Sequence, residues 1–234
     1  VLTMLGMIIG VGAVITMVAL ATGARTTIEE RVKSAGTNMI MVNAGNFSSG
    51  GVRMGQGNST TLTPEDAAAI KQIPGVQFAA AGANSRAQVI AGNQNWSTQV
   101  QGTDIDLPQI RSWPTKYGAF FTPQDVSSAS KVAVLGTVVS NILFGEEVDP
   151  TGQIIRIRNQ PFKVIGVMIS KGQSSMGQDQ DDTIFVPYTT VMKKLQGQQN
   201  INNVTVSAVS ADAIQETAEA IRGELRIRHK IGSP

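Results

Sequence analysis

Side chains that could do chemistry are few in this sequence and lie far apart. His229 is the only histidine and falls at the predicted end of a helix, and cysteine is absent. Metal centres and Ser-His triads need a histidine that neighbouring side chains hold in place, whereas disulfides and thiolate metal sites need cysteine. We therefore expect His229 to be a solvated side chain near the negative end of a helix dipole, which suits a protonated imidazole.

Three carboxylates in one polar segment, Asp179, Asp181 and Asp182, could supply the oxygen ligands that calcium takes. The spacing of an EF-hand is not met, because no glycine stands at its sixth position and no glutamate at its twelfth. A solvated loop is therefore the expected role of this segment. Met39, Met41 and the methionines before them are explained by apolar packing rather than by copper or haem ligation.

The motifs of nucleotide and ester chemistry are also missing. The sequence contains no G-x-x-x-x-G-K-[ST] phosphate loop, no G-x-G-x-x-G after a strand and no G-x-S-x-G nucleophile turn. The net charge is only +2, and aromatic residues make up 5%, so a nucleic acid would find neither a basic tract nor stacking platforms. We expect no enzyme activity, no metal or cofactor site and no nucleic-acid partner for this chain.

The N-terminal stretch, residues 1–24, carries no charged side chain, and only three threonines interrupt its apolar surface. A helix of this length rises about 36 Å, enough to cross a hydrocarbon core of about 30 Å. A cleaved signal peptide would need a basic start, and no basic residue precedes the apolar run. We predict a transmembrane helix over 1–24, truncated at its start, with Gly6, Gly10 and Gly12 allowing close packing of another helix.

A helical extension is expected next, over residues 25–35, because apolar residues recur one turn apart and Gly36 suits a helix end. Residues 37–45 are predicted to form a strand, with Met39 and Met41 on one face and Ile40 and Val42 on the other. Residues 45–61 are rich in Gly, Ser and Asn, which is typical of a mobile loop.

Strands and helices alternate through the rest of the chain. Thr63, followed by proline and two acids, predicts a helix start, and the turn residues 92–95 predict a hairpin. A second hairpin is expected around Asn159-Gln160, and a helix over 188–195. Ser210 is the predicted cap of the last helix, whose apolar residues recur at helical spacing.

This order of elements changes near residue 104 and returns near residue 200, which predicts an insertion. The expected fold is α+β, with two subdomains. Residues 36–103 and 200–230 form the first subdomain, and residues 104–199 form the second, inserted one.

One polar loop, residues 171–182, joins two apolar strands and contains a single apolar residue, Met176. It cannot bury enough surface to order itself well, although the strands hold both its ends. Such loops often carry recognition, and an idle solvated connection fits the sequence equally well. The candidate residues for contact with a partner or client are Gln173, Ser174, Ser175, Met176, Gln178 and Asp179.

Several segments together resemble a known family. They are LTMLGMIIGVGAVITMVALATGA followed by RVKSAGTNMIMV, and then KVAVLGTVVSNILFG, DPTGQIIRIRNQPFKVIGVM and DDTIFVPYTTVMKKL. In this order they resemble the first membrane helix, the entry strand and three landmarks of the periplasmic core domain in MacB/FtsX-like permeases of ABC transporters.

The resemblance implies a domain inserted between the first two helices of a four-helix permease, with a porter-like subdomain that contains the inserted one. It implies a permease homodimer in the bacterial inner membrane, with most of this chain periplasmic or extracellular. It also implies a separate or fused ABC ATPase domain that binds ATP and Mg, and, in tripartite exporters, a periplasmic adaptor and an outer-membrane channel. The chain would relay ATP-driven movement of the membrane helices, for export of macrolide-like or peptide-like substrates.

Two other functions remain open at this point. A lipoprotein-extraction permease of the same family would share all these segments. A membrane-anchored binding protein acting alone belongs to a different class, and would need no helix face lined by glycine.

Overall fold

The computed structural model describes residues 38–45, 48–49, 52–53, 61–174 and 177–230, together with Gly12, Met17 and Val18. Its contacts divide the chain into two units, Val1–Thr37 and Asn38–Pro234. Gly12, Met17 and Val18 are helical, while the rest of the predicted membrane span, including Gly6 and Gly10, and the extension at 25–35 lie outside the described residues. No helix within the described ranges has the length and apolar character needed to cross a membrane.

The second unit is a mixture of strands and short helices, which confirms the predicted α+β class. Its strands are β1 (Met39–Asn43), β2 (Ser48–Ser49), β3 (Val52–Arg53), β4 (Val76–Ala91), β5 (Gln94–Thr103), β6 (Thr115–Gly118), β7 (Val132–Leu135), β8 (Ile154–Ile157), β9 (Gln160–Met168), β10 (Thr183–Pro187) and β11 (Asn203–Ala208). Its helices are α2 (Pro64–Ile70), α3 (Leu107–Ile110), α4 (Pro123–Ser128), α5 (Thr137–Phe144), α6 (Tyr188–Thr190), the π-helix η1 (Val191–Gln196) and α7 (Ile214–Arg228).

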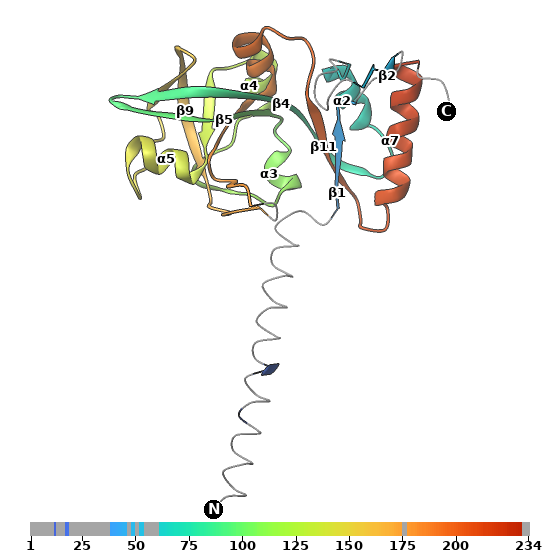
Figure 1. The fold of residues 1–234 in the computed structure, drawn as a ribbon, viewed down its shortest axis with the longest axis horizontal. Helices are drawn as coiled ribbons and strands as arrows, with labels where there is room; N and C mark the ends of the chain where they lie inside the picture. The colour runs from blue at the N-terminus through green and yellow to red at the C-terminus, as the bar shows by residue number, and fades with distance from the viewer. Residues whose placement is uncertain are drawn as a thin grey trace, which may run out of the picture. The chain divides into compact units, whose positions relative to one another are not determined.

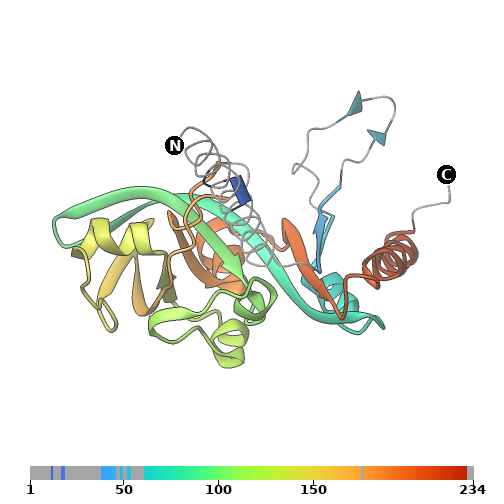
Figure 2. The same cartoon turned by 90° about the horizontal axis from the view of Figure 1, so that it is seen from below.

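The longest strand, β4, has 16 residues and takes part in two different sets of strand pairs. Its first half pairs with β11, which in turn pairs with β1, and all three strands are antiparallel. Its second half pairs with β5 and β8. β4 therefore runs from the neighbourhood of β1 and β11 to that of β5 and β9, and α7 and α5 lie at opposite ends of it (Figure 1, Figure 2).

Around the second half of β4, the strand pairs form a closed circuit. β4 pairs with β5, β5 with β10, β10 with β7, β7 with β9, β9 with β8, and β8 with β4 again. The β5–β10 and β7–β9 pairs are parallel, and β6 pairs with the end of β9 at residues 166–168, beyond the segment that pairs with β8. This arrangement is a small barrel, whose closure leaves none of these strands with a free edge except where β6 extends the sheet.

Alternation along the strands decides which side chains fill this barrel. In β4, Ala87 and Val89 are buried, whereas Arg86 and Gln88 between them are exposed. The inward side chains join one large core with Val139 and Leu143 of α5 and with the buried side of η1. A second core lies outside β7, β9 and β10, where Trp113 packs edge-on against Phe185 with ring centroids 5.4 Å apart.

Two glycines, Gly82 and Gly102, allow neighbouring segments to pack closely where the pairing of β4 changes from β11 to β5. A Cβ on Gly82 would lie 1.8 Å from Oδ1 of Asn203, and one on Gly102 would lie 2.7 Å from Cγ2 of Val191 and 2.8 Å from the Ala83 carbonyl oxygen. A side chain at Gly102 would therefore meet the backbone of the neighbouring strand, whereas one at Gly82 would first have to displace the Asn203 side chain.

Most of the predicted elements are present. The hairpin at 92–95 is confirmed, while the second turn lies at Arg158 and Asn159, one residue earlier than predicted, because both adopt the positive φ of a type I′ turn. The helix expected over 188–195 is a short α-helix followed by a π-helix. Part of the loop expected at 45–61 pairs as β2 and β3, and most of the remainder lies outside the described residues. The division into subdomains at 104 and 200 stays a prediction.

The C-terminal helix α7 begins at Ile214, after a turn in which the Ser210 hydroxyl accepts a hydrogen bond from the Ala213 N–H at 3.2 Å. Ser210 therefore caps the turn before the helix rather than the helix itself. The apolar stripe predicted for this helix is confirmed where Ile221 is buried and Leu225 packs against the main core.

A buried carboxylate joins the end of α7 to the start of α2. Thr63 and Asp66 form a capping box, as the predicted helix start required. The Asp66 carboxylate also accepts hydrogen bonds from Arg228 Nε at 2.7 Å and His229 Nε2 at 2.9 Å. The expectation that His229 is merely solvated is therefore wrong, since its ring lies against a carboxylate that is nearly inaccessible to solvent.

Asp66 should link stability to pH. Burial alone would raise the pKa of the Asp66 carboxyl, but the hydrogen bonds from Arg228, Thr63 and His229 together lower it below its ordinary value. A carboxyl with a lowered pKa in the folded state contributes stability at neutral pH, and this contribution is lost as pH falls below about 4.

We predict that Asp66→Asn reduces the free energy of unfolding by about 2–3 kcal/mol at pH 7. The substitution removes the charge that faces Arg228 and replaces one of the two acceptor oxygens with an NH2 donor, so the Arg228 guanidinium and the Thr63 amide can no longer both be accepted. Urea unfolding followed by circular dichroism measures this loss. The difference from the unmodified protein should shrink at pH 3. Glu65→Gln removes the same charge from an exposed neighbour and should change stability by less than about 0.5 kcal/mol. Equal effects of the two substitutions would contradict this account.

Candidate functional site

The candidate contact loop lies between β9 and β10. Gln173 and Asp179 form an isolated antiparallel bridge, and the Ser174 N–H donates to the Gln178 carbonyl at 2.7 Å. Gln173, Gln178 and Asp179 are exposed, and Ser174 is half-buried. The remaining two candidate residues, Ser175 and Met176, lie outside the described residues. Four of the six candidates are therefore brought together on one small hairpin.

The base of this loop is held by two carboxylates. The buried Asp181 accepts hydrogen bonds from the Ser170 hydroxyl and from the N–H groups of Lys171 and Gly172, both at 2.9 Å. Asp182 accepts from Trp96 Nε1 at 2.8 Å and from the Thr98 hydroxyl at 2.7 Å. Both side chains are thus part of the folded framework, and the expectation of a solvated role is wrong for Asp181 and Asp182.

Beside this base, two cations lie over the ring of the buried Trp113. The Arg111 guanidinium carbon is 5.0 Å and the Lys171 ammonium 5.4 Å from the ring centroid. Lys171 donates to the Arg111 carbonyl, and Arg111 donates to the side-chain oxygen of Gln180. Desolvation, with the Arg111 charge nearby, lowers the pKa of Lys171 to about 8. This cluster fixes the loop to the turn after α3 through cation–π contacts.

Sequence reasoning missed this cluster, since Arg111, Trp113 and Lys171 are brought together only when β9 pairs with β6. The available signal was the tryptophan after Arg111, which is an aromatic surface that a cation can cover. Across the described ranges, no three His, Cys, Asp or Glu side chains gather as a metal site would require. The arrangement is therefore suited to hold an exposed loop tip on a rigid base.

Asp181 should matter for folding, whereas the loop tip should not. Asp181→Ala leaves the Lys171 and Gly172 amides without their acceptor, and we predict a loss of about 2–3 kcal/mol in the free energy of unfolding. Thermal unfolding followed by circular dichroism measures this effect. Asp212→Ala removes an exposed carboxylate and should be neutral within about 0.5 kcal/mol. A neutral Asp181→Ala would show that the base of the loop does not support the fold.

Comparison with known proteins identifies the family. The family model described as the MacB-like periplasmic core domain matches residues 1–224. The protein named "Macrolide export ATP-binding/permease protein MacB" from Marinobacter nauticus is 40% identical over 98% of this chain and 35% of its own length. The protein of the same name from Chlorobaculum tepidum is 37% identical, over 99% of this chain and 36% of its own length. The chain thus spans about a third of the length of these curated relatives.

Solved structures show the same fold. The periplasmic region of MacB from Actinobacillus actinomycetemcomitans superposes with a TM-score of 0.72 at 22% identity, covering 87% of this chain and 90% of that one. The extracellular domain of the noncanonic ABC-type transporter YknZ from Gram-positive bacteria gives a TM-score of 0.66 at 21% identity, covering 82% of this chain and 95% of that one. With a family model matching nearly the whole sequence and relatives close to 40% identical, the chain belongs to the MacB-like periplasmic core domain family.

Proposed function

We propose that this chain is the extracytoplasmic core domain of an ABC transporter permease, and that it relays ATP-driven movement of membrane helices to periplasmic clients or partners. The observation that carries the proposal is the 40% identity, over 98% of the chain, to a protein named as a macrolide export ATP-binding/permease protein. A macrolide-like substrate is the one that this name suggests, and a peptide-like substrate is the alternative that we propose beside it. The proposed location is the bacterial inner membrane, with the described domain on the periplasmic or extracellular side.

The connectivity of the domain supports a mechanical role. The chain enters the second unit just before β1, and its last described helix is α7. β1 is hydrogen-bonded to β11 and β11 to β4, and α7 packs against β1. Because antiparallel ladders resist sliding of one strand along another, a displacement of β1 is passed on to β4. β4 then continues without interruption into the barrel, so β1, β11 and β4 move together with the barrel.

The partners required by this role are an ABC ATPase domain, which binds ATP and Mg, and a second permease copy. A periplasmic adaptor and an outer-membrane channel are the further partners that we propose for a tripartite exporter. The domain itself supplies no step of ATP hydrolysis in this proposal. Its work is to change position when the membrane helices do, and to contact what lies outside the membrane.

Inserting a flexible linker of ten Gly and Ser residues between Thr37 and Asn38, in the full-length transporter, tests the relay. Such a linker is a flexible random coil, so a displacement of the membrane helix would not be transmitted through it to β1. We predict that export, measured as resistance to a macrolide in cells that lack their own exporter, falls to the background while ATP hydrolysis in membranes is retained.

The matched control carries the same linker between Gln198 and Gln199, in an exposed loop, and should export normally. Export that persists with the linker at residue 37 would contradict the proposed relay of movement. A binding protein acting alone would show no export that depends on ATP in either variant, so the same experiment separates the two classes of function.

The exposed tip of the β9–β10 loop is the proposed client or partner contact within this role. We predict that replacing residues 173–178 by Gly and Ser shifts the melting temperature by only a few degrees, since surface changes cost about 0.5 kcal/mol or less. Export should fall while ATP hydrolysis is retained. Unchanged export would make the tip an idle connection, and unfolding of the domain would make it structural.

A further inference from the structure

One part of the outer surface of the barrel is not covered by other elements of the described domain. The outer side of β7, of β10 and of the end of β9 around Met168 is covered by the second core, which contains Trp113, Phe121 and Val126. Over β8, β4 and β5 the outward residues are instead exposed polar side chains, among them Arg156, Gln88 and Gln99. This face is therefore available for contact.

The charged residues of this region all have the same sign. Strands β4, β5, β8 and β9 and the helix η1 contain no aspartate or glutamate. We name their exposed cations, with the turn residue between β8 and β9, the basic wall. Its members are Arg86, Arg156, Arg158, Lys163, Lys193 and Lys194. None of them forms an ion pair within the part of the chain that the structure describes.

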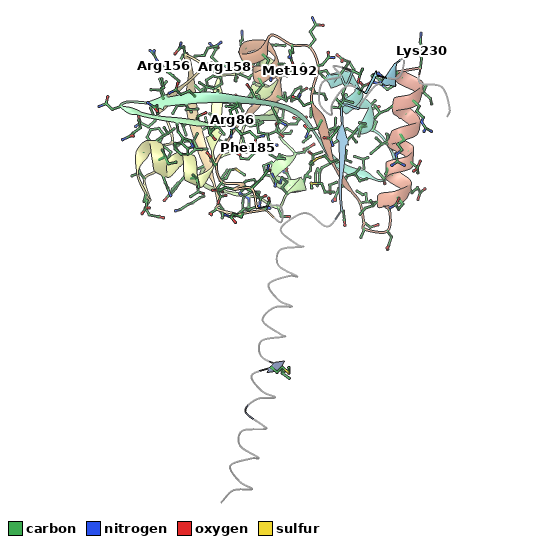
Figure 3. All side chains as sticks on the ribbon, viewed as in Figure 1. Arg86, Arg156, Arg158, Phe185, Met192 and Lys230 are labelled. Atoms are coloured by element: carbon green, nitrogen blue, oxygen red, sulfur yellow. The ribbon has the colours of Figure 1, made fainter. Side chains whose placement is uncertain are left out.

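The pairing of the strands brings these cations close together. Arg156 lies opposite Ile90, and the Arg158 N–H donates to the Gln88 carbonyl, so Arg86 is a diagonal neighbour of Arg158. Diagonal side chains on neighbouring strands lie about 7–8 Å apart at Cα. All three labelled arginines lie on the half of the domain that carries β4 and β5, away from Lys230 (Figure 3).

The wall is also held in shape by one of its own members. Arg158 adopts a φ of +48° and its guanidinium donates to the Leu195 carbonyl at 2.8 Å and the Arg86 carbonyl at 3.3 Å. Gln160 Nε2 donates to the Lys194 carbonyl at 2.8 Å. These bonds fix η1, and with it the backbone of Lys193 and Lys194, beside the β8–β9 turn. The cations are therefore presented on a rigid surface although like charges at this spacing repel each other.

We propose that the basic wall docks an acidic protein surface, a segment that presents several aspartate or glutamate side chains. This surface would belong to a partner in the transporter assembly, so the inference rests on the proposed function. Carboxylates relieve the repulsion among the cations, and arginine binds them through two parallel hydrogen bonds. The intervening Gln88, Ser97 and Gln99 side chains offer amide and hydroxyl partners, as the polar part of a protein interface does.

A lipid surface fits these residues less well. Proteins that lie on a bilayer combine basic residues with bulky apolar or aromatic side chains that enter the headgroup region. On the basic wall, Ile154 is the large apolar side chain with high exposure, at 65%, whereas Trp96 of β5 is turned inward to Asp182. A protein partner is therefore favoured.

Photo-crosslinking in cells tests this contact with the full-length transporter in its native membrane. The photoreactive residue p-benzoylphenylalanine replaces Gln88 on the wall, or Gln215, an equally exposed glutamine of α7, as the control. We expect an adduct at Gln88 whose crosslinked peptide, identified by mass spectrometry, contains several acidic residues. The adduct should decrease with added salt, because exposed charge pairs are screened.

Charge reversal supplies the second arm. The triple variant Arg86→Glu, Arg156→Glu and Lys163→Glu should reduce the adduct by about tenfold or more, since several exposed ion pairs are lost together. The control variant Arg222→Glu, Arg226→Glu and Lys230→Glu has the same change in net charge and should leave the adduct unchanged. Replacing the acidic residues of the crosslinked peptide by lysine should restore the adduct in the first variant only.

Three results would refute the proposed docking surface. The first is an adduct to lipid, which would assign the basic wall to the membrane. The others are an adduct at Gln88 that charge reversal leaves unchanged, and an adduct at Gln88 no stronger than that at Gln215. The linker experiment at residue 37 reads export and not contact. Export that survives the linker, together with a persistent Gln88 adduct, would reject the relay and keep the docking surface. Export that the linker abolishes, with no acidic adduct at Gln88, would keep the relay and reject the docking surface.

Discussion

The double pairing of β4 is the constraint on which the rest of this domain depends. Every buried backbone N–H and C=O group needs a hydrogen-bond partner, and a strand of 16 residues needs them along its whole length. β11 supplies them for the first half, and β5 and β8 supply them for the second. Gly102 lacks the side chain that would meet the Ala83 backbone at this change of partners, and Gly82 leaves room for the Asn203 side chain. The two parts of the sheet are thus one hydrogen-bonded structure.

Buried and half-buried carboxylates hold the connections that the sheet does not. Asp66 joins the end of α7 to the start of α2, while Asp181 and Asp182 close the base of the β9–β10 loop on Trp96 and on nearby amides. Each accepts two or more hydrogen bonds from neighbouring groups. Because these acids are used inside the fold, they do not neutralise the exposed cations of the basic wall.

Local signals in the sequence predicted many of the elements, whereas the pairing of distant segments was beyond them. The Thr63 cap, the hairpin at 92–95 and the stripe around Ile221 depend on neighbours within a few residues, and all are present. The role of Asp181 depends on its hydrogen bond with Ser170, and that of Asp66 on its bond with Arg228. The composition of the polar segment does not contain this information, and it predicted a solvated Asp181. The closed barrel also lay beyond sequence reasoning, because the partners of β8 are decided by three-dimensional pairing. The family resemblance supplied what such local patterns cannot.

The pairing of β1 with β11 has a consequence for how the domain is made. Met39 faces Ser207, and Asn43 faces Asn203, across almost the whole length of the domain. Contacts between such distant residues require closure of a very large loop and make folding slow. β1 is synthesised before its partner β11, so its side chains lack this partner until residue 207 has been made. A factor that shields this strand during synthesis or translocation would protect the whole domain from aggregation.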